Sequence, residues 1–182
     1  KNPLKFQKMT FHKLIKKAKK TTFGIDHGFE NIKTYEDWKK NVPIRDYEGL
    51  KEYVDLVVDG KKDVLWPGKP QYFCKTSGTT SGTKYIPLTK EALPFHIKAA
   101  RDAILSFIYE TKKTAVVNGK MIFLQGSPDL ENINGVLTGR LSGITAHHIP
   151  KYLQKNRLPS LATNRIENWE DKVDAIVDET IN

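Results

Sequence analysis

An unbroken run of small hydroxyl residues and glycine, Thr76-Ser77-Gly78-Thr79-Thr80-Ser81-Gly82-Thr83, constrains this chain more than any other feature of its sequence. Short strand-like segments flank the run, with residues 72–74 before it and residues 84–86 after it. The two glycines allow the backbone to adopt positive φ, and they let a ligand approach the amides closely. We therefore expect a tight loop whose two ends are anchored between strands.

The residue types in this run suit the oxygen atoms of phosphate groups. Successive backbone N–H groups in such a turn form an anion-binding concavity. Lys84 adds one positive charge, and side-chain hydroxyls add donors from Thr76, Ser77, Thr79, Thr80, Ser81 and Thr83. The spacing differs from the standard P-loop, because Gly78 and Gly82 are too close together and Thr83 precedes Lys84. The G-x-G-x-x-G dinucleotide motif is absent, and composition alone leaves a plain surface loop as the alternative.

Length and composition limit the class of protein. The 182 residues suffice for one domain or a large part of one, and 38% hydrophobic with 28% charged residues indicate a packed core. No apolar run reaches membrane-spanning length, and residues 1–4 show no signal-peptide core. Because Cys74 is the single cysteine, an internal disulfide and a cysteine-based zinc site are excluded. We expect the Cys74 side chain to lie in the core. These features predict a cytoplasmic protein without membrane contact.

The positive charge is concentrated in the first 20 residues. They hold eight lysines and no acid, so about +1 of the formal net charge of +9 remains for the other 162 residues (9 − 8). We predict that residues 1–20 form a basic amphipathic segment separate from residues 21–182. A solvated helix face explains these lysines, and nucleic-acid or anionic-membrane binding is the rival. The absence of arginine, with only Phe6 and Phe11 available for base stacking, does not favour nucleic acid.

Three helices are predicted in the first part of the chain. The first covers residues 10–20 with Thr10 as its cap, since Phe11, Leu14, Ile15 and Ala18 fall at helical spacing. Thr34-Tyr35-Glu36-Asp37 resembles a capping box, and Pro43 ends the short helix that follows it. The third begins near Asp46, follows an apolar stripe from Leu50 to Val58, and ends at Gly60.

The rest of the chain alternates helices and strands. Thr89 caps a long helix whose expected buried face holds Ala92, His96, Ala99, Ala100, Ala103, Phe107 and Ile108. Met121–Leu124 is apolar throughout and predicts a strand buried on both faces. Residues 126–160 are interpreted as irregular, with a short strand over 144–149, and Trp169, Val173, Ile176 and Val177 define a final helix. The alternation predicts an α/β fold.

An ordered set of segments adds a family resemblance that extends from about Thr21 to Asn182. The segments are KTSGTTSGTKYIP, TTFGIDHGF, YEDW, VPIRDYEGLKEYV, VLWPGKPQYF, GKMIFLQGSP, GRLSGITAHHIPKYLQ and NRLPS. Together they resemble the bacterial branch of the auxin-responsive acyl acid amido synthetases, within the adenylate-forming superfamily. The resemblance implies the N-terminal part of an adenylate-forming-enzyme fold, in which helices pack on a mixed sheet and the phosphate loop joins two strands. Members are several times longer, so we expect an N-terminal portion of the adenylating domain that is inactive alone.

The same resemblance implies a reaction and its cofactors. A carboxylic acid reacts with ATP and Mg²⁺ to give an acyl-adenylate, and an amine or amino acid then takes the acyl group. By this resemblance Thr76–Lys84 would bind the nucleotide phosphates, with Lys84 and Thr79 as the catalytic pair. A basic nucleic-acid- or phosphate-binding module without ligase activity is the alternative, and a non-catalytic remnant is a third. Self-association through exposed apolar edges is a further expectation.

Three residues are candidates for the acyl-substrate site. The resemblance points to Arg101 on the long helix, and Arg140 in GRLSG is a similar candidate, although both also fit surface roles. His147 is a candidate wall of the acyl pocket. Because adjacent residues of a strand face opposite sides, His147 and His148 do not suit a shared metal ion, and we predict no protein metal site.

Overall fold

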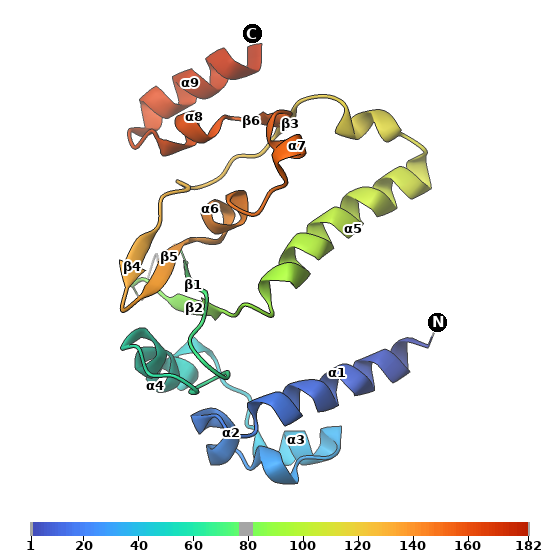
Figure 1. Cartoon of the computed structure of the whole chain (residues 1–182), viewed down its shortest axis with the longest axis vertical. Helices are drawn as coiled ribbons and strands as arrows, with labels where there is room; N and C mark the ends of the chain where they lie inside the picture. The colour runs from blue at the N-terminus through green and yellow to red at the C-terminus, as the bar shows by residue number, and fades with distance from the viewer. Residues whose placement is uncertain (1, 77–81, 182) are drawn as a thin grey trace. The chain divides into compact units, whose positions relative to one another are not determined.

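The computed structural model of the chain describes residues 2–76 and 82–181 (Figure 1). It separates into two compact units. The first unit comprises Lys1–Gln71 with Ile133–Val136, and the second comprises Tyr72–Asn132 with Leu137–Asn182. Each unit has its own cluster of buried apolar side chains.

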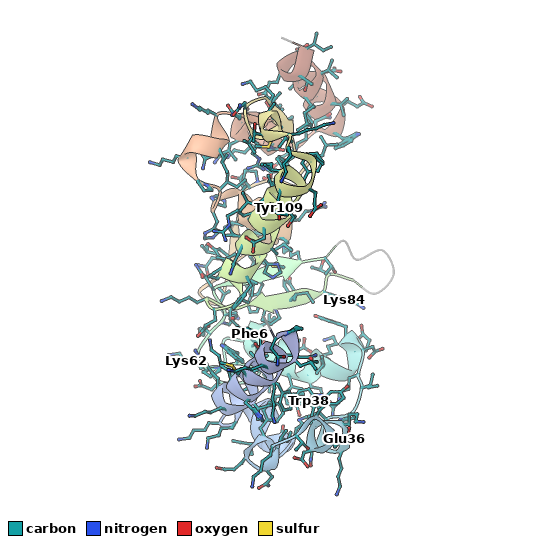
Figure 2. All side chains as sticks on the ribbon, turned by 90° about the vertical axis from the view of Figure 1, so that its right-hand side faces the viewer. Phe6, Glu36, Trp38, Lys62, Lys84 and Tyr109 are labelled. Carbon is teal, nitrogen blue, oxygen red and sulfur yellow. The ribbon has the colours of Figure 1, made fainter. Side chains whose placement is uncertain are left out.

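The first unit is helical. Its elements are α1 (Pro3–Ala18), α2 (Thr22–Asp26), the 3-10 helix η1 (Phe29–Asn31), α3 (Tyr35–Asn41) and α4 (Tyr47–Val58). Ile15 and Ala18 at the end of α1 are buried with Phe29 and Ile32, and Trp38 of α3 packs against this cluster (Figure 2). The apolar stripe of α1 is therefore buried only in its last turns, since residues 2–10 are all exposed.

Local capping decides where these helices begin. The predicted capping box is confirmed, because the Asp37 N–H donates to the Thr34 hydroxyl at 3.1 Å and the Thr34 N–H donates to the Asp37 carboxylate at 2.8 Å. Helix α4 begins near Asp46 as predicted, and Asp46 caps it by accepting from the Gly49 N–H at 2.9 Å. The predicted start of α1 at Thr10 is wrong. The helix begins at Pro3, because Asn2 accepts from the Lys5 N–H and proline favours the first helical position.

A mixed sheet forms the centre of the second unit. In the described part of the chain its strand order is β2-β1-β5-β4, with β1 (Tyr72–Lys75), β2 (Tyr85–Leu88), β4 (Glu131–Ile133) and β5 (Val136–Arg140). Strand β1 pairs antiparallel with β2 and parallel with β5. The predicted strands on both sides of the Ser/Thr/Gly run and the predicted mixed sheet are thus confirmed. Helix α6 (Leu141–Ala146) packs on β1 (Figure 1). Ile144 is buried with Tyr72 and Cys74, as expected for Cys74.

The remaining elements surround a second, two-stranded sheet. Strand β3 (Met121–Ile122) pairs parallel with β6 (Arg157–Leu158). The helices are α5 (Leu93–Thr111), η2 (Thr114–Val117), α7 (Lys151–Gln154), α8 (Leu161–Arg165) and α9 (Trp169–Ile181). Helix α9 lies beside α8 (Figure 1), where Lys172 is buried and its Nζ donates to the Asn164 carbonyl at 2.7 Å. The predicted final helix is confirmed, although Trp169, Val173 and Val177 are exposed.

Several predictions for residues 89–160 are wrong. Helix α5 begins at Leu93 rather than at Thr89. The Thr89 hydroxyl instead accepts a hydrogen bond from the Ala92 N–H, in the turn that precedes the helix. Its expected buried face is exposed at His96, Ala99, Ala100, Ala103 and Phe107, because Leu93 and Ile97 make the contacts with the core instead.

The predictions for residues 121–160 are also wrong. Met121–Leu124 was expected to be a strand buried on both faces, but β3 ends at Ile122. The exposed fractions of Ile122, Phe123 and Leu124 are 54%, 47% and 71%. The region interpreted as irregular contains β4, β5, α6, α7 and β6. The expected strand over 144–149 is instead the end of α6 and the turn after it, and α6 continues from β5 without a connecting loop.

Candidate functional site

The carboxyl ends of β1 and β5 meet at one edge of the mixed sheet, because the two strands are parallel and Lys75 is in register with Arg140. The chain leaves β1 into the Ser/Thr/Gly run and leaves β5 directly into α6. In α/β proteins this edge of the sheet is where ligands bind. Thr76, the first residue of the predicted phosphate loop, therefore follows β1 at the same edge as Arg140.

The two ends of the Ser/Thr/Gly run are held together. The Thr76 N–H donates to the Lys84 carbonyl at 3.1 Å, one step beyond the pairing of Lys75 with Tyr85. Lys84 is half-buried and lies beside the ends of the two strands (Figure 2). Gly82 has a φ of +78°, and a Cβ there would meet no atom of the described residues within 4 Å. The predicted nucleotide-binding residues Ser77, Gly78, Thr79, Thr80 and Ser81 lie outside the described residues.

Charged side chains flank this edge. Lys75 Nζ lies 2.6 Å from Glu131 Oε2, which joins the end of β1 to β4. Arg140 is exposed, and its stem lies on Gly126, where a Cβ would come within 2.6 Å of Arg140 Cδ. The lack of a side chain at Gly126 thus gives the Arg140 side chain room at this edge of the sheet. Neither the Lys75–Glu131 ion pair nor this packing was predicted from the sequence.

The other two acyl-site candidates lie on other elements. Arg101 is exposed on α5, and its guanidinium pairs with its neighbour Asp102 at 3.0 Å. His147 follows α6, and its Nε2 lies 2.6 Å from the Pro128 carbonyl oxygen. Because a carbonyl oxygen only accepts, the Nε2 atom of His147 carries the proton. Among the described contacts, none joins Arg101 or His147 to the ends of the loop.

A polar pair beside the second sheet was also missed. The guanidinium Nη2 of Arg157 donates to Gln125 Oε1, and its central carbon lies 6.0 Å from the centre of the Phe123 ring. Burial lowers the pKa of Arg157. The Nε of Arg157 and the Nε2 of Gln125 are buried without a hydrogen-bond partner among the described residues. The segments GKMIFLQGSP and NRLPS contain both residues, but no sequence pattern indicated that they meet.

The first unit carries a basic hollow of about 470 Å³. Four lysines line it with one carboxylate, from residues Lys16, Lys17, Lys19, Lys20, Thr21, Asp63 and Pro67. Lys17 Nζ lies 5.7 Å from the centre of the Trp66 ring, and Lys19 pairs with Glu30 at 3.3 Å. This concentration of positive charge attracts anions in general.

Within the described residues 2–76 and 82–181, no set of three or more His, Cys, Asp and Glu side chains is arranged to bind a metal ion. No helix in the same ranges has the length and hydropathy needed to cross a membrane.

The sequence matches a known protein family over most of its length. Residues 1–173 match the model of the GH3 family N-terminal domain. The chain is 30% identical over 104 residues to indole-3-acetic acid-amido synthetase GH3.15 of Arabidopsis thaliana, covering 48% of this chain and 18% of that protein. It is 25% identical over 138 residues to jasmonoyl–L-amino acid synthetase JAR6 of Nicotiana attenuata, covering 74% and 23%. The chain thus spans about a fifth of the length of these relatives.

Solved structures show the same fold. A structure of GH3.15 acyl acid amido synthetase superposes with a TM-score of 0.72 at 18% identity, over 94% of this chain and 29% of that one. The same enzyme from Arabidopsis in complex with 2,4-DB gives a TM-score of 0.64 at 22% identity, over 79% and 26%. The mixed α/β fold therefore resembles the N-terminal region of these synthetases.

Proposed function

Because the chain belongs to the GH3 family, we propose that it forms the N-terminal, phosphate-binding part of an ATP-dependent acyl acid amido synthetase. The observation that carries this proposal is the match of residues 1–173 to the N-terminal domain of that family. The relatives named above are amido or amino acid synthetases, which act on a carboxylic acid and an amino acid. A cytoplasmic location remains part of the proposal.

The residues at the carboxyl edge of β1 and β5 fit a nucleotide with its metal ion. ATP with Mg²⁺ would supply the adenylyl group that activates the acid, and AMP would leave when the amine attacks the acyl carbon. The backbone amides of Thr76–Lys84 would hold the β- and γ-phosphates. Lys84 would place one compact positive charge next to these oxygens, with the Thr79 hydroxyl as a further donor. The protein's contribution is then positioning and charge stabilisation.

The acyl-site candidates differ in how well they are placed for this role. Arg140 lies in register with Lys75 at the end of β1, so its charge would be available to the nucleotide or to the acid. Arg101 shares its charge with Asp102, and the Nε2 proton of His147 is engaged by Pro128. We therefore rank Arg140 first among the three. We also propose that the chain alone is inactive, because it lacks most of the length of the relatives.

ATP–pyrophosphate exchange tests this function. The measurement uses the longest protein that the gene encodes, a panel of carboxylic acids, and the variants Lys84→Ala and Thr79→Ala. Exposed Lys90, which follows β2, gives a matched control as Lys90→Ala. We expect exchange that depends on the acid, is reduced at least about tenfold in the two loop variants, and is retained in the control. Exchange that is equal in all four proteins would remove the loop from the mechanism, and no exchange with any acid would remove the ligase assignment.

The basic hollow supports a second candidate, a phosphate-binding module without ligase activity. Four lysines surround space for a small polyanion, and nucleic acid remains the less favoured ligand. Binding of pyrophosphate to this chain would then weaken steeply with salt, would be lost in Lys16→Ala with Lys20→Ala, and would be unaffected by Lys84→Ala. Self-association of the chain is a separate proposal that sedimentation would test.

A further inference from the structure

Helix α1 has apolar side chains on the face that points away from its core. Its buried residues are Ile15 and Ala18, which define the inner face. Phe6 precedes Ile15 by nine residues, and Met9 precedes Ala18 by the same number. This spacing corresponds to about two and a half helical turns, so Phe6 and Met9 lie on the opposite side of the helix. The exposed fractions of Phe6 and Met9 are 58% and 56%, so packing in the core does not explain them.

Lysines continue the same side of the helix. Lys13 follows Phe6 by seven residues and Lys16 follows Met9 by seven, which is about two turns in each case. We call Phe6, Met9, Lys13 and Lys16 the outer face of α1, and all four residues are exposed. Residues 1–20 contain no acid, and among the ion pairs between described residues none includes Lys13 or Lys16. The positive charge of the outer face is therefore available to an anionic partner.

The basic hollow adjoins the C-terminal end of the outer face. Lys16 belongs to both, and the hollow adds Lys17, Lys19 and Lys20 against the one carboxylate of Asp63. Its volume of about 470 Å³ admits a phosphate group. The apolar side chains thus lie near the start of α1, and a surplus of positive charge lies near its end.

A partner that fits this surface must offer negative charge next to an apolar phase. An anionic lipid bilayer offers both, because its headgroups attract lysines and its acyl boundary accepts apolar side chains. Lysine side chains can extend to the headgroups while their helix lies flat on the surface. Nucleic acid offers the charge, but it gains little from Met9, and residues 1–20 contain no arginine. The combination of apolar and basic residues on one face therefore favours lipid.

We propose that α1 lies flat on an anionic lipid surface, an inference that is independent of the proposed function. Phe6 and Met9 insert at the acyl boundary, and the lysines of the outer face and the basic hollow contact the headgroups. The expectation of no membrane contact was based on the lack of a spanning segment, and a helix that lies on the surface needs none. The cytoplasmic leaflet of membranes is the anionic one, which agrees with the proposed cytoplasmic location.

Vesicle co-sedimentation of the 182-residue chain tests this contact. The probes are vesicles of phosphatidylcholine alone and vesicles with about 30% phosphatidylserine, at about 0.1 M and about 0.5 M salt. Two double variants separate charge from apolar contact. Lys13→Gln with Lys16→Gln removes two charges, and Phe6→Gln with Met9→Gln removes the apolar side chains. Glutamine is a good helix former, so both variants should keep α1.

The first unit offers a matched control for each variant. Lys61→Gln with Lys62→Gln removes two exposed lysines that lie outside α1 and the hollow. Ile25→Gln with Ile44→Gln removes two exposed apolar residues that also lie outside α1. Because all the replaced side chains are exposed, the Tm of every variant should stay close to that of the wild type, so weaker binding would not reflect unfolding.

We expect the wild-type chain and both controls to bind vesicles with phosphatidylserine at least about tenfold more tightly than phosphatidylcholine vesicles. The charge variant and the apolar variant should each bind the anionic vesicles at least about tenfold more weakly than the wild type. The higher salt concentration should weaken binding of the wild type because it screens the lysines. Phe6→Gln with Met9→Gln should leave ATP–pyrophosphate exchange in solution unchanged, so the two proposals succeed or fail separately.

Four results would overturn the lipid contact. Equal binding of the wild type to the two kinds of vesicle would remove the role of charge. Wild-type affinity in Phe6→Gln with Met9→Gln would leave only a general electrostatic attraction. Tighter binding to a short DNA duplex than to anionic vesicles would assign the surface to nucleic acid. The longest protein that the gene encodes should bind the same vesicles, and a failure to do so would show that its other parts cover α1.

Discussion

The Tyr72 hydroxyl and the Nε2 of His148 lie 3.0 Å apart, and this contact joins the start of β1 to the turn after α6. The two rings are nearly perpendicular, with their centres 5.7 Å apart. Tyr72 is buried in the core of the second unit, so the contact connects the strand that leads into the candidate loop with the helix that follows Arg140. The protonation of His148 is therefore coupled to the stability of the candidate site.

We predict that the second unit becomes less stable in mild acid through His148. Burial, together with the neighbouring His147, lowers the pKa of His148 in the folded chain. The unfolded chain then binds the proton more readily, so the free energy of unfolding decreases as pH falls below about 6.5, the ordinary value for histidine. Urea unfolding between about pH 7.5 and about pH 5 should show a smaller decrease for His148→Gln than for the wild type. Identical pH dependence in the two proteins would contradict this prediction.

Glu179 of α9 is predicted to stabilise the connection to α8. The Glu179 carboxylate accepts hydrogen bonds from the Ser160 N–H at 2.6 Å and from the Thr163 hydroxyl at 2.5 Å. Burial raises the pKa of Glu179, but these hydrogen bonds outweigh burial, so the pKa is lowered overall. Its contribution is therefore complete above the ordinary glutamate pKa and is lost as pH falls below it. At neutral pH we expect Glu179→Gln to reduce the free energy of unfolding by about 1–2 kcal/mol, measured in urea.

The exposed neighbour Asp174 provides the control for Glu179, because it is an acid on the same helix without these contacts. Asp174→Asn should change the free energy of unfolding by less than about 0.5 kcal/mol. Equal losses in the two variants would show that the negative charge of α9, rather than the contacts of Glu179, stabilises the unit.

Features set by a few adjacent residues could be predicted from the sequence. The capping box of Thr34 and Asp37 and the cap at Asp46 are local, and both helices begin where these residues indicate. The strands on either side of the Ser/Thr/Gly run were predicted for the same reason. One local signal was overlooked, because Asn134-Gly135 is a strong hairpin signal inside the region interpreted as irregular.

Features that depend on tertiary contacts could not be predicted. The apolar residues Ile122 and Phe123 indicated burial, but burial depends on which element covers a strand, and sequence periodicity does not contain that information. Arg157 and Gln125 meet only because β6 pairs with β3 across more than 30 intervening residues. The lateral position of Arg140 beside Lys75 likewise follows from the parallel pairing of β1 with β5.

We predict that Gly143 of α6 cannot be replaced by alanine without a large loss of stability. A Cβ at this position would lie 2.2 Å from the Ser127 carbonyl oxygen, which is backbone and has little freedom to move. We expect Gly143→Ala to reduce the free energy of unfolding by about 2–3 kcal/mol in urea. Gly119→Ala is the control, because a Cβ at Gly119 meets nothing within 4 Å, and it should change stability by less than about 0.5 kcal/mol. A tolerated Gly143→Ala would mean that α6 does not approach residue 127 so closely.

The hairpin between β4 and β5 allows two contributions of one residue to be separated. Asn134 has a φ of +49° and Gly135 a φ of +84°, as a two-residue turn of this kind requires. The Asn134 side chain also donates to the Val58 carbonyl at 2.8 Å. Asn134→Ala loses this hydrogen bond and strains the backbone, so we expect it to cost about 2 kcal/mol of unfolding free energy. Asn134→Gly loses the hydrogen bond alone and should cost about half as much, because glycine adopts positive φ without strain. Urea unfolding of the two variants measures the difference. A glycine variant that is as unstable as the alanine variant would assign the whole effect to the contact with Val58.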